Sequence, residues 1–225
     1  MIGNKQFKYQ EKVWGYRYVY KTFQDENKFG SSADIGANGE FKLSNNLTFN
    51  AFILNGEGYK NIQDDDGYLK IGGNLIYEFK NGFSAKLYYD SEPGDENFNV
   101  TNVGYFVGYS KNNSRIGIEY NKINNAESYK KPSLDSNLSG YSFYGSQKIG
   151  GKGEIYARYD NLESNTLVGN SIPWNFGKDG KLLIIGYQTK VSNGFKLSFN
   201  YRNYKYLDES KNSKSMFFIN AEIKI

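Results

Sequence analysis

The chain has 225 residues, with 28 Lys and Arg against 24 Asp and Glu, and it contains neither Cys nor His. Without Cys there is no disulfide, no thiolate metal site and no Cys nucleophile, and without His there is no Ser-His pair and no imidazole zinc site. A chain of this length fits a single all-β domain. We therefore expect a protein that is not an enzyme and that needs no cofactor and no metal ion.

Apolar and polar residues alternate in many short segments, and a period of two is the period of a β-strand. In the segment 195–202, Phe195, Leu197, Phe199 and Tyr201 alternate with polar and charged residues. A helical stripe would need apolar residues spaced by three and four, which these runs lack. In chain order we predict about twelve strands, at 13–22, 33–43, 47–55, 67–79, 83–90, 100–110, 114–122, 138–149, 152–160, 181–191, 195–206 and 214–225.

The connections between these segments alternate in length along the chain. Short turns, which contain Asn and Gly pairs suited to tight hairpins, lie at 44–46, 80–82, 111–113, 150–151 and 192–194. Long polar loops lie at 23–32, 56–66, 91–99, 123–137, 161–180 and 207–213. Short periplasmic turns at one end and long extracellular loops at the other are typical of a transmembrane, antiparallel, up-and-down β-barrel.

Periodicity alone does not separate a membrane barrel, with its apolar face outward, from a soluble sandwich or lipocalin-like barrel, with its apolar face inward. Three features favour the membrane barrel: a polar face that mixes charges of both signs, aromatic residues near the strand ends, and strand lengths close to the ~9–11 residues of a tilted span. We therefore expect one β-barrel domain over residues 1–225, with 1–12 as an N-terminal lead-in segment.

If the apolar face meets lipid, the polar face lines a lumen. Its cations outnumber its anions, which predicts a mild preference for anions, although many of these charges are expected to pair with each other across strands. The candidate pore-lining residues are Arg17, Lys21, Lys42, Lys70, Glu78, Lys86, Arg115, Glu119, Glu154, Arg158, Lys190, Lys196, Arg202 and Glu222.

Strand number and tilt predict a lumen about 10 Å wide. The residues before position 13 are too few for a plug domain, so we expect no plug. The longest loop, 161–180, contains Trp174 between Pro173 and Asn175. It either folds inward as a constriction, caps the rim or packs on a neighbouring subunit.

Several stretches carry a family resemblance: WGYRYVYKTFQDE at 14–26, KFGSSADIG at 28–36, NGEGYK at 55–60 and RYDNL at 158–162. They resemble the outer-membrane porins of Bacteroidetes and related Gram-negative bacteria, and the resemblance implies a β-barrel channel related to phosphate-selective porins. Compared with that family, we expect the chain to be shortened at its N-terminus, where it lacks a signal peptide and several strands. It also ends in Ile225 rather than in an aromatic residue.

Together these features predict an outer-membrane porin, a passive diffusion channel for ions and small hydrophilic solutes. Its expected partners are outer-membrane lipid, lipopolysaccharide and those solutes, and a homo-oligomer is possible. Nucleic acid is not an expected partner, because an alternating basic and acidic wall makes a poor phosphate track. The alternatives are an occluded structural barrel, truncated or designed and without transport, and a soluble β-barrel that binds a ligand.

Overall fold

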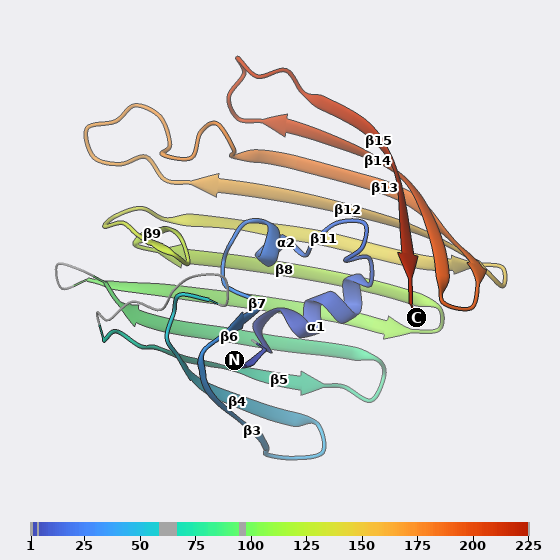
Figure 1. Ribbon diagram of the computed structural model, residues 1–225, viewed down its shortest axis with the longest axis horizontal. Helices are drawn as coiled ribbons and strands as arrows, with labels where there is room; N and C mark the ends of the chain where they lie inside the picture. Colours follow the sequence, from blue (N-terminus) through green and yellow to red (C-terminus); the bar gives the residue numbers. More distant parts are fainter. Residues whose placement is uncertain (1, 4, 59–66, 95–97, 225) are drawn as a thin grey trace.

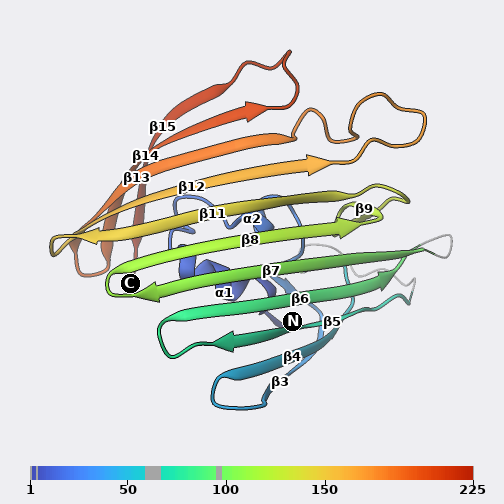
Figure 2. The same cartoon turned by 180° about the vertical axis from the view of Figure 1, so that it is seen from behind.

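One large antiparallel sheet of 11 strands forms the body of the protein (Figures 1 and 2). The computed structural model describes residues 2–3, 5–58, 67–94 and 98–224. The strands lie in the sheet in the order in which they follow one another along the chain, so that each inner strand pairs with the one before it and the one after it. These strands are β3 (Gly36–Lys42), β4 (Leu47–Leu54), β5 (Lys70–Glu78), β6 (Phe83–Pro93), β7 (Asn99–Lys111), β8 (Ser114–Asn124), β11 (Leu138–Ile149), β12 (Gly153–Ser164), β13 (Gly180–Ser192), β14 (Phe195–Tyr206) and β15 (Lys214–Ile223).

The antiparallel β fold predicted from the alternation is confirmed, although the chain is mostly β rather than all-β, and each of these strands overlaps a predicted segment. Short turns join the strands at one end of the sheet and long connections join them at the other, as expected (Figure 1). Two small pairs lie outside the sheet: β1 (Ile2–Gly3) with β2 (Ala33–Asp34), and β9 (Ala126–Ser128) with β10 (Lys131–Pro132). Parts of the predicted loops 56–66 and 91–99, namely 59–66 and 95–97, lie outside the described residues.

The predicted strand at 13–22 is wrong. Residues up to Trp14 belong to helix α1 (Lys5–Trp14), the residues after it form turns, and a short helix, α2 (Phe23–Glu26), follows. Gly15 follows the last residue of α1; its φ of 72° is left-handed and its N–H donates to the Glu11 carbonyl oxygen at 2.8 Å, as at many helix C-termini. Among the described residues, no helix has the length and apolar character needed to cross a membrane.

The outer face of the sheet is apolar and the inner face is polar. Along β8, Ile116, Ile118 and Tyr120 are exposed, whereas Glu119 and Asn121 are buried. The same inversion recurs on the other strands, where the exposed positions carry large apolar side chains. A water-soluble β-protein places its apolar side chains in the opposite way, against its core. The alternation therefore describes a sheet whose apolar side faces outward.

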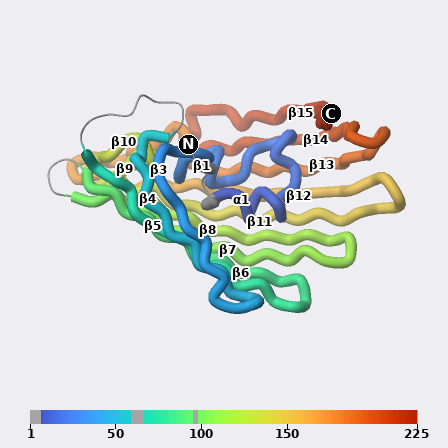
Figure 3. Tube along the Cα trace, turned by 60° about the horizontal axis from the view of Figure 1, so that its bottom comes forward, coloured from blue at the N-terminus to red at the C-terminus, as the bar shows by residue number. Residues whose placement is uncertain are grey.

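Strands β3 and β15 form the two edges of the sheet, and among the described strands no pairing joins them. The edge strands are also the most open to the surroundings: Phe217 and Ile219 of β15 are 85% and 71% exposed. The sheet curves between these edges into a trough, and the N-terminal part of the chain lies along its inner side (Figure 3).

Candidate functional site

Residues 5–34, called the N-terminal segment below, occupy the inner, polar side of the sheet (Figures 1 and 3). Helix α1 packs against β7, β8 and β11. Phe7, Trp14, Tyr16, Phe23 and Phe29 of the segment are each at most 2% exposed. The expectation of a lumen without a plug is therefore wrong, because the segment that was predicted to be wall and lead-in fills the trough instead.

An aromatic layer on the inner wall receives the segment. Gly186 of β13 pairs with Tyr156 of β12, and a Cβ atom at Gly186 would lie 2.3 Å from the Tyr156 ring, so the ring can lie flat only across a glycine. Tyr16 stacks on Tyr156 with ring centroids 4.0 Å apart. Trp14 meets the edges of Tyr144 and Tyr156 at 5.4 and 5.9 Å. These contacts form the largest apolar cluster of the interior.

Arg158 of β12 joins the wall to the segment. Its Nε and Nη2 donate to the two Asp160 carboxylate oxygens at 2.8 and 2.7 Å, and its Nη1 donates to the Lys21 carbonyl oxygen. The guanidinium also lies 5.2 Å from the Trp14 ring and 5.5 Å from the Tyr20 ring. A guanidinium is suited to this place because it forms a planar fork with a carboxylate while it stacks on aromatic faces.

Two further arginines repeat this arrangement on either side. Arg202 of β14 donates to the Val19 carbonyl oxygen at 2.8 Å and lies 4.9 Å from the Tyr20 ring. Arg115 of β8 pairs with Glu154 at 2.9 Å and lies 5.0 Å from the Tyr16 ring. The three arginines thus bind the backbone or the rings of the segment across the strands from β8 to β14.

Part of the contact between segment and wall is polar, and some of its buried polar atoms have no hydrogen-bond partner among the described residues. Among the described residues, buried side-chain atoms without a hydrogen-bond partner include Thr22 Oγ1 and Gln24 Oε1 on the segment, and Asn102 Oδ1 and Glu119 Oε1 on the wall. Each such atom costs about 1–3 kcal/mol. Because of these unpartnered atoms, the segment is held less firmly than an apolar core of the same size.

Burial raises the pKa of Tyr20 well above its usual range, so that its hydroxyl stays neutral.

The candidate pore-lining residues fall into four groups. Lys70, Lys86, Glu119, Glu154, Arg158 and Arg202 are buried on the inner side; Arg115, Lys196 and Glu222 are partly buried there; Lys42, Glu78 and Lys190 are exposed at strand ends; Arg17 and Lys21 lie on the segment. Placing Arg17 and Lys21 on a wall strand is wrong, since both lie close to Asp25 of the segment. A role of the others in a pore stays a prediction.

Several charges of the wall pair with a charge on the neighbouring strand, as we predict from the sequence. Lys196 and Glu222 lie 2.8 Å apart, and Lys70 lies 2.9 Å from Glu92. In these pairs each strand contributes one charge of the ion pair. Cross-strand pairing of this kind satisfies a polar interior without an apolar core.

Sequence reasoning missed the role of the segment, although a signal was present. Phe7, Gln10, Val13 and Trp14, all buried, are spaced as on one face of a helix, and Gly15 follows as a stop. The aromatic residues from Trp14 onward are spaced by two, as in a strand. Because this spacing begins where the helical pattern ends, it hides the helix.

Two cavities flank the segment, one near each end of the sheet. At the short-turn end, a cavity of about 350 Å³ is lined by Gly15, Arg115, Lys148 and Lys196, among others. At the long-loop end, a cavity of about 740 Å³ is lined by residues of the segment and of the loops. The segment thus separates two hollows that lie toward opposite ends of the strands.

Comparisons with known proteins bear on the fold alone. No protein-family model matches the chain, and no curated protein sequence matches it. Among solved structures, the chain is similar to OmpF of Salmonella typhi, solved in complex with daunomycin, with a TM-score of 0.66 over 94% of this chain and 71% of that chain. The two sequences are 14% identical. The chain therefore has a porin-like β fold, and no family match supports the narrower resemblance to phosphate-selective porins.

Proposed function

We propose that the chain forms the wall of a channel in the bacterial outer membrane, for passive passage of ions and small hydrophilic solutes, with the N-terminal segment narrowing the lumen. The observation that carries this proposal is the inverted sheet, apolar outside and charged inside. The similarity of the chain's fold to a porin structure also supports the proposed channel. The proposed partners are outer-membrane lipid, lipopolysaccharide and the permeating solutes, and the proposed role is not enzymatic.

In a bilayer both edges of the sheet need partners, since an unpaired backbone group in lipid costs several kcal/mol. The two edge strands, β3 and β15, run in the same direction, because ten antiparallel steps separate them in the sheet of 11 strands. Direct closure would form one parallel pair, whereas one added strand would close the wall with antiparallel pairs alone. In the proposed channel these two edges are paired in the membrane, either directly or through one added strand.

The charges of the wall support a mild preference for anions. Arg158 keeps its pairing with Asp160, and Arg115 keeps its pairing with Glu154. The hydrogen bonds of Arg202 go to neutral carbonyl and amide oxygens. Arg202 is therefore a cation without a carboxylate partner among the described residues, and charged side chains that line a pore bias its ion selectivity.

Single-channel recording of refolded full-length protein in a planar bilayer, under a salt gradient, tests this function. We expect small but stable conductance steps and a reversal potential that favours anions. A cation-selective reversal potential would contradict the preference for anions. No conductance from protein shown to be folded and inserted would contradict the channel itself and favour an occluded structural barrel.

A further inference from the structure

The cavity of about 740 Å³ at the long-loop end is lined by both the N-terminal segment and the wall. Tyr20 and Lys28 come from the segment, Trp174 and Lys178 from the loop after β12, and Tyr206 from the end of β14. Its volume lies within the range of about 300–1,000 Å³ of pockets that hold small organic ligands. The cavity therefore has room for a solute larger than a simple ion.

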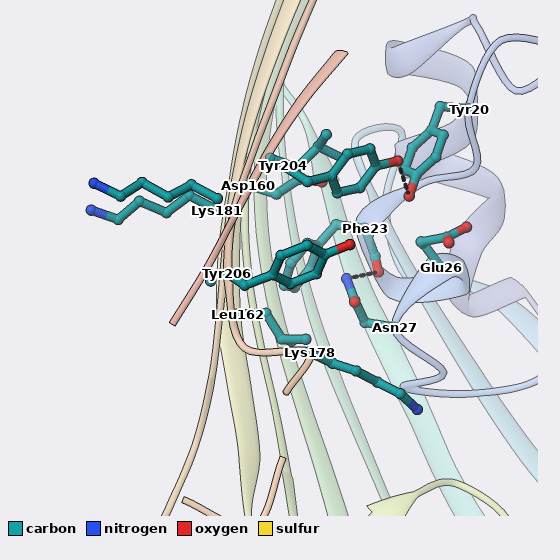
Figure 4. A pocket seen from close by; sticks show the side chains of 13 residues that line it. Tyr20, Phe23, Glu26, Asn27, Asp160, Leu162, Lys178, Lys181, Tyr204 and Tyr206 are labelled. Carbon is teal, nitrogen blue, oxygen red and sulfur yellow. Dashed lines mark hydrogen bonds between the residues drawn. The ribbon is translucent and has the colours of Figure 1, made fainter. Parts of the chain in front are cut away.

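Aromatic rings form one part of the lining, and hydrogen bonds fix their positions. The Tyr204 hydroxyl donates to the Tyr20 hydroxyl at 3.0 Å, and the Trp174 indole nitrogen donates to the Asn137 carbonyl oxygen at 3.1 Å. Figure 4 draws a smaller pocket beside the cavity that shares Tyr20, Tyr204 and Tyr206 with it, and it shows these rings on the side of the wall that faces α2. Flat rings with a polar edge suit a solute that has a ring face of its own.

Positive charge forms the other part of the lining. Lys131 pairs with Glu127 at 3.4 Å, whereas Lys28 and Lys178 have no ion pair within the part of the chain that the structure describes. Lys211 lies 3.9 Å from Asp208, so the lysines that add charge to the cavity are Lys28 and Lys178, against the single carboxylate of Glu26. The surplus favours an anionic solute.

We infer that this cavity binds a small ring-shaped organic anion of the sugar-carboxylate class, with the ring against the aromatic side chains and the carboxylate near Lys28 and Lys178. The inference rests on the proposed function, because it names the solute that collects at one mouth of the channel. A bound solute touches the segment and the wall together, so that it also stabilises the docked segment by linkage.

Calorimetric titration of the full chain, folded in detergent, tests the inference with three probes. D-glucuronate carries a ring and a charge, D-glucose carries the ring alone, and inorganic phosphate carries charge alone. We expect glucuronate to bind at least about tenfold more tightly than either other probe, because only glucuronate uses both parts of the lining. Equal binding of glucuronate and glucose, or phosphate binding as tight as glucuronate binding, overturns the inference.

A matched pair of lysine variants locates the site. Lys178 lines the cavity and extends to the side of the wall that faces Asn27, whereas Lys181, three residues later, is outside the cavity's lining and its side chain extends from the opposite side of the wall (Figure 4). We expect K178A to weaken glucuronate binding at least about fivefold, the loss of one charge-assisted contact, and K181A to leave it unchanged. Equal effects of the two substitutions overturn the inference.

The titration and the bilayer recording separate the two proposals. Conductance steps together with no glucuronate binding would overturn the inference and leave the channel standing. Glucuronate binding by folded, inserted protein that gives no conductance would overturn the channel and leave a binding protein.

Discussion

Replacing Arg158 with alanine is expected to destabilise the folded protein by about 3–5 kcal/mol, the usual result of removing one partner from a buried ion pair. Arg158 is 1% exposed, and its loss leaves the Asp160 carboxylate, 5% exposed, without a cation. The hydroxyl of Ser142, which donates to Asp160 Oδ1 at 2.6 Å, is then the main remaining partner. Urea unfolding of protein folded in lipid vesicles measures the change.

Two further substitutions show whether the effect comes from the contacts of Arg158. Arg158→Lys keeps a charge but loses the planar fork, so its loss of stability should be intermediate. Lys190 of the neighbouring β13 is exposed, and Lys190→Ala should change stability by less than about 0.5 kcal/mol. If the alanine variants at 158 and 190 were equally stable, the buried ion pair would not hold the inner wall as described.

The second large effect is expected on conductance, from the double substitution of Trp14 and Tyr16 by alanine. Each truncation of a large buried aromatic residue costs about 3–5 kcal/mol of packing, and both rings contact Tyr156 of the wall. The segment should then leave the wall for much of the time. Single-channel conductance should rise severalfold relative to the wild type, with longer open periods.

A matched double variant on the outer face controls for the general loss of two rings. Tyr105 and Tyr120 form a ring pair 6.2 Å apart on β7 and β8, and both are exposed. Their joint replacement by alanine should leave the conductance of folded, inserted protein unchanged. Equal conductance of the wild type and the Trp14 and Tyr16 variant would show that the segment does not obstruct the lumen.

The strands could be predicted from the sequence because two independent signals agree. The segment 195–202 alternates strictly, and Asn-Gly or Gly-Gly turns mark where hairpins reverse. The antiparallel order then follows from chain order alone. The direction of the apolar face could also be inferred, because charges of both signs recur on the opposite face.

The N-terminal segment could not be placed in the same way, because its pattern fits two environments. Trp14, Tyr16, Tyr18 and Tyr20 alternate as lipid-facing girdle residues do. In the structure the rings of Trp14 and Tyr20 instead lie against the guanidinium groups of Arg158 and Arg202 on the polar wall. Alternation reports which side chains share a face, and it does not report which surface that face meets.

The candidate site was predictable to a similar extent. Arg158 and Arg202 could be assigned to the inner face, because strand residues two apart share a face. Their partners on the segment, the carbonyl oxygens of Lys21 and Val19, are backbone atoms far away in the sequence. Every residue has a backbone carbonyl oxygen, so such contacts cannot be predicted from the residue type, and only the folded chain shows them.

The channel requires that the apolar side of the sheet faces lipid while the polar side holds the segment. A charge placed on the outer face near the middle of a strand tests it most directly. Ile118, near the middle of β8, is exposed, and so is Leu43, which follows the end of β3. Urea unfolding in lipid vesicles should show Ile118→Lys to be destabilised by about 2–4 kcal/mol and Leu43→Lys by about 0–1 kcal/mol. If both variants unfold like the wild type, the outer face meets water and the sheet is not the wall of a membrane channel.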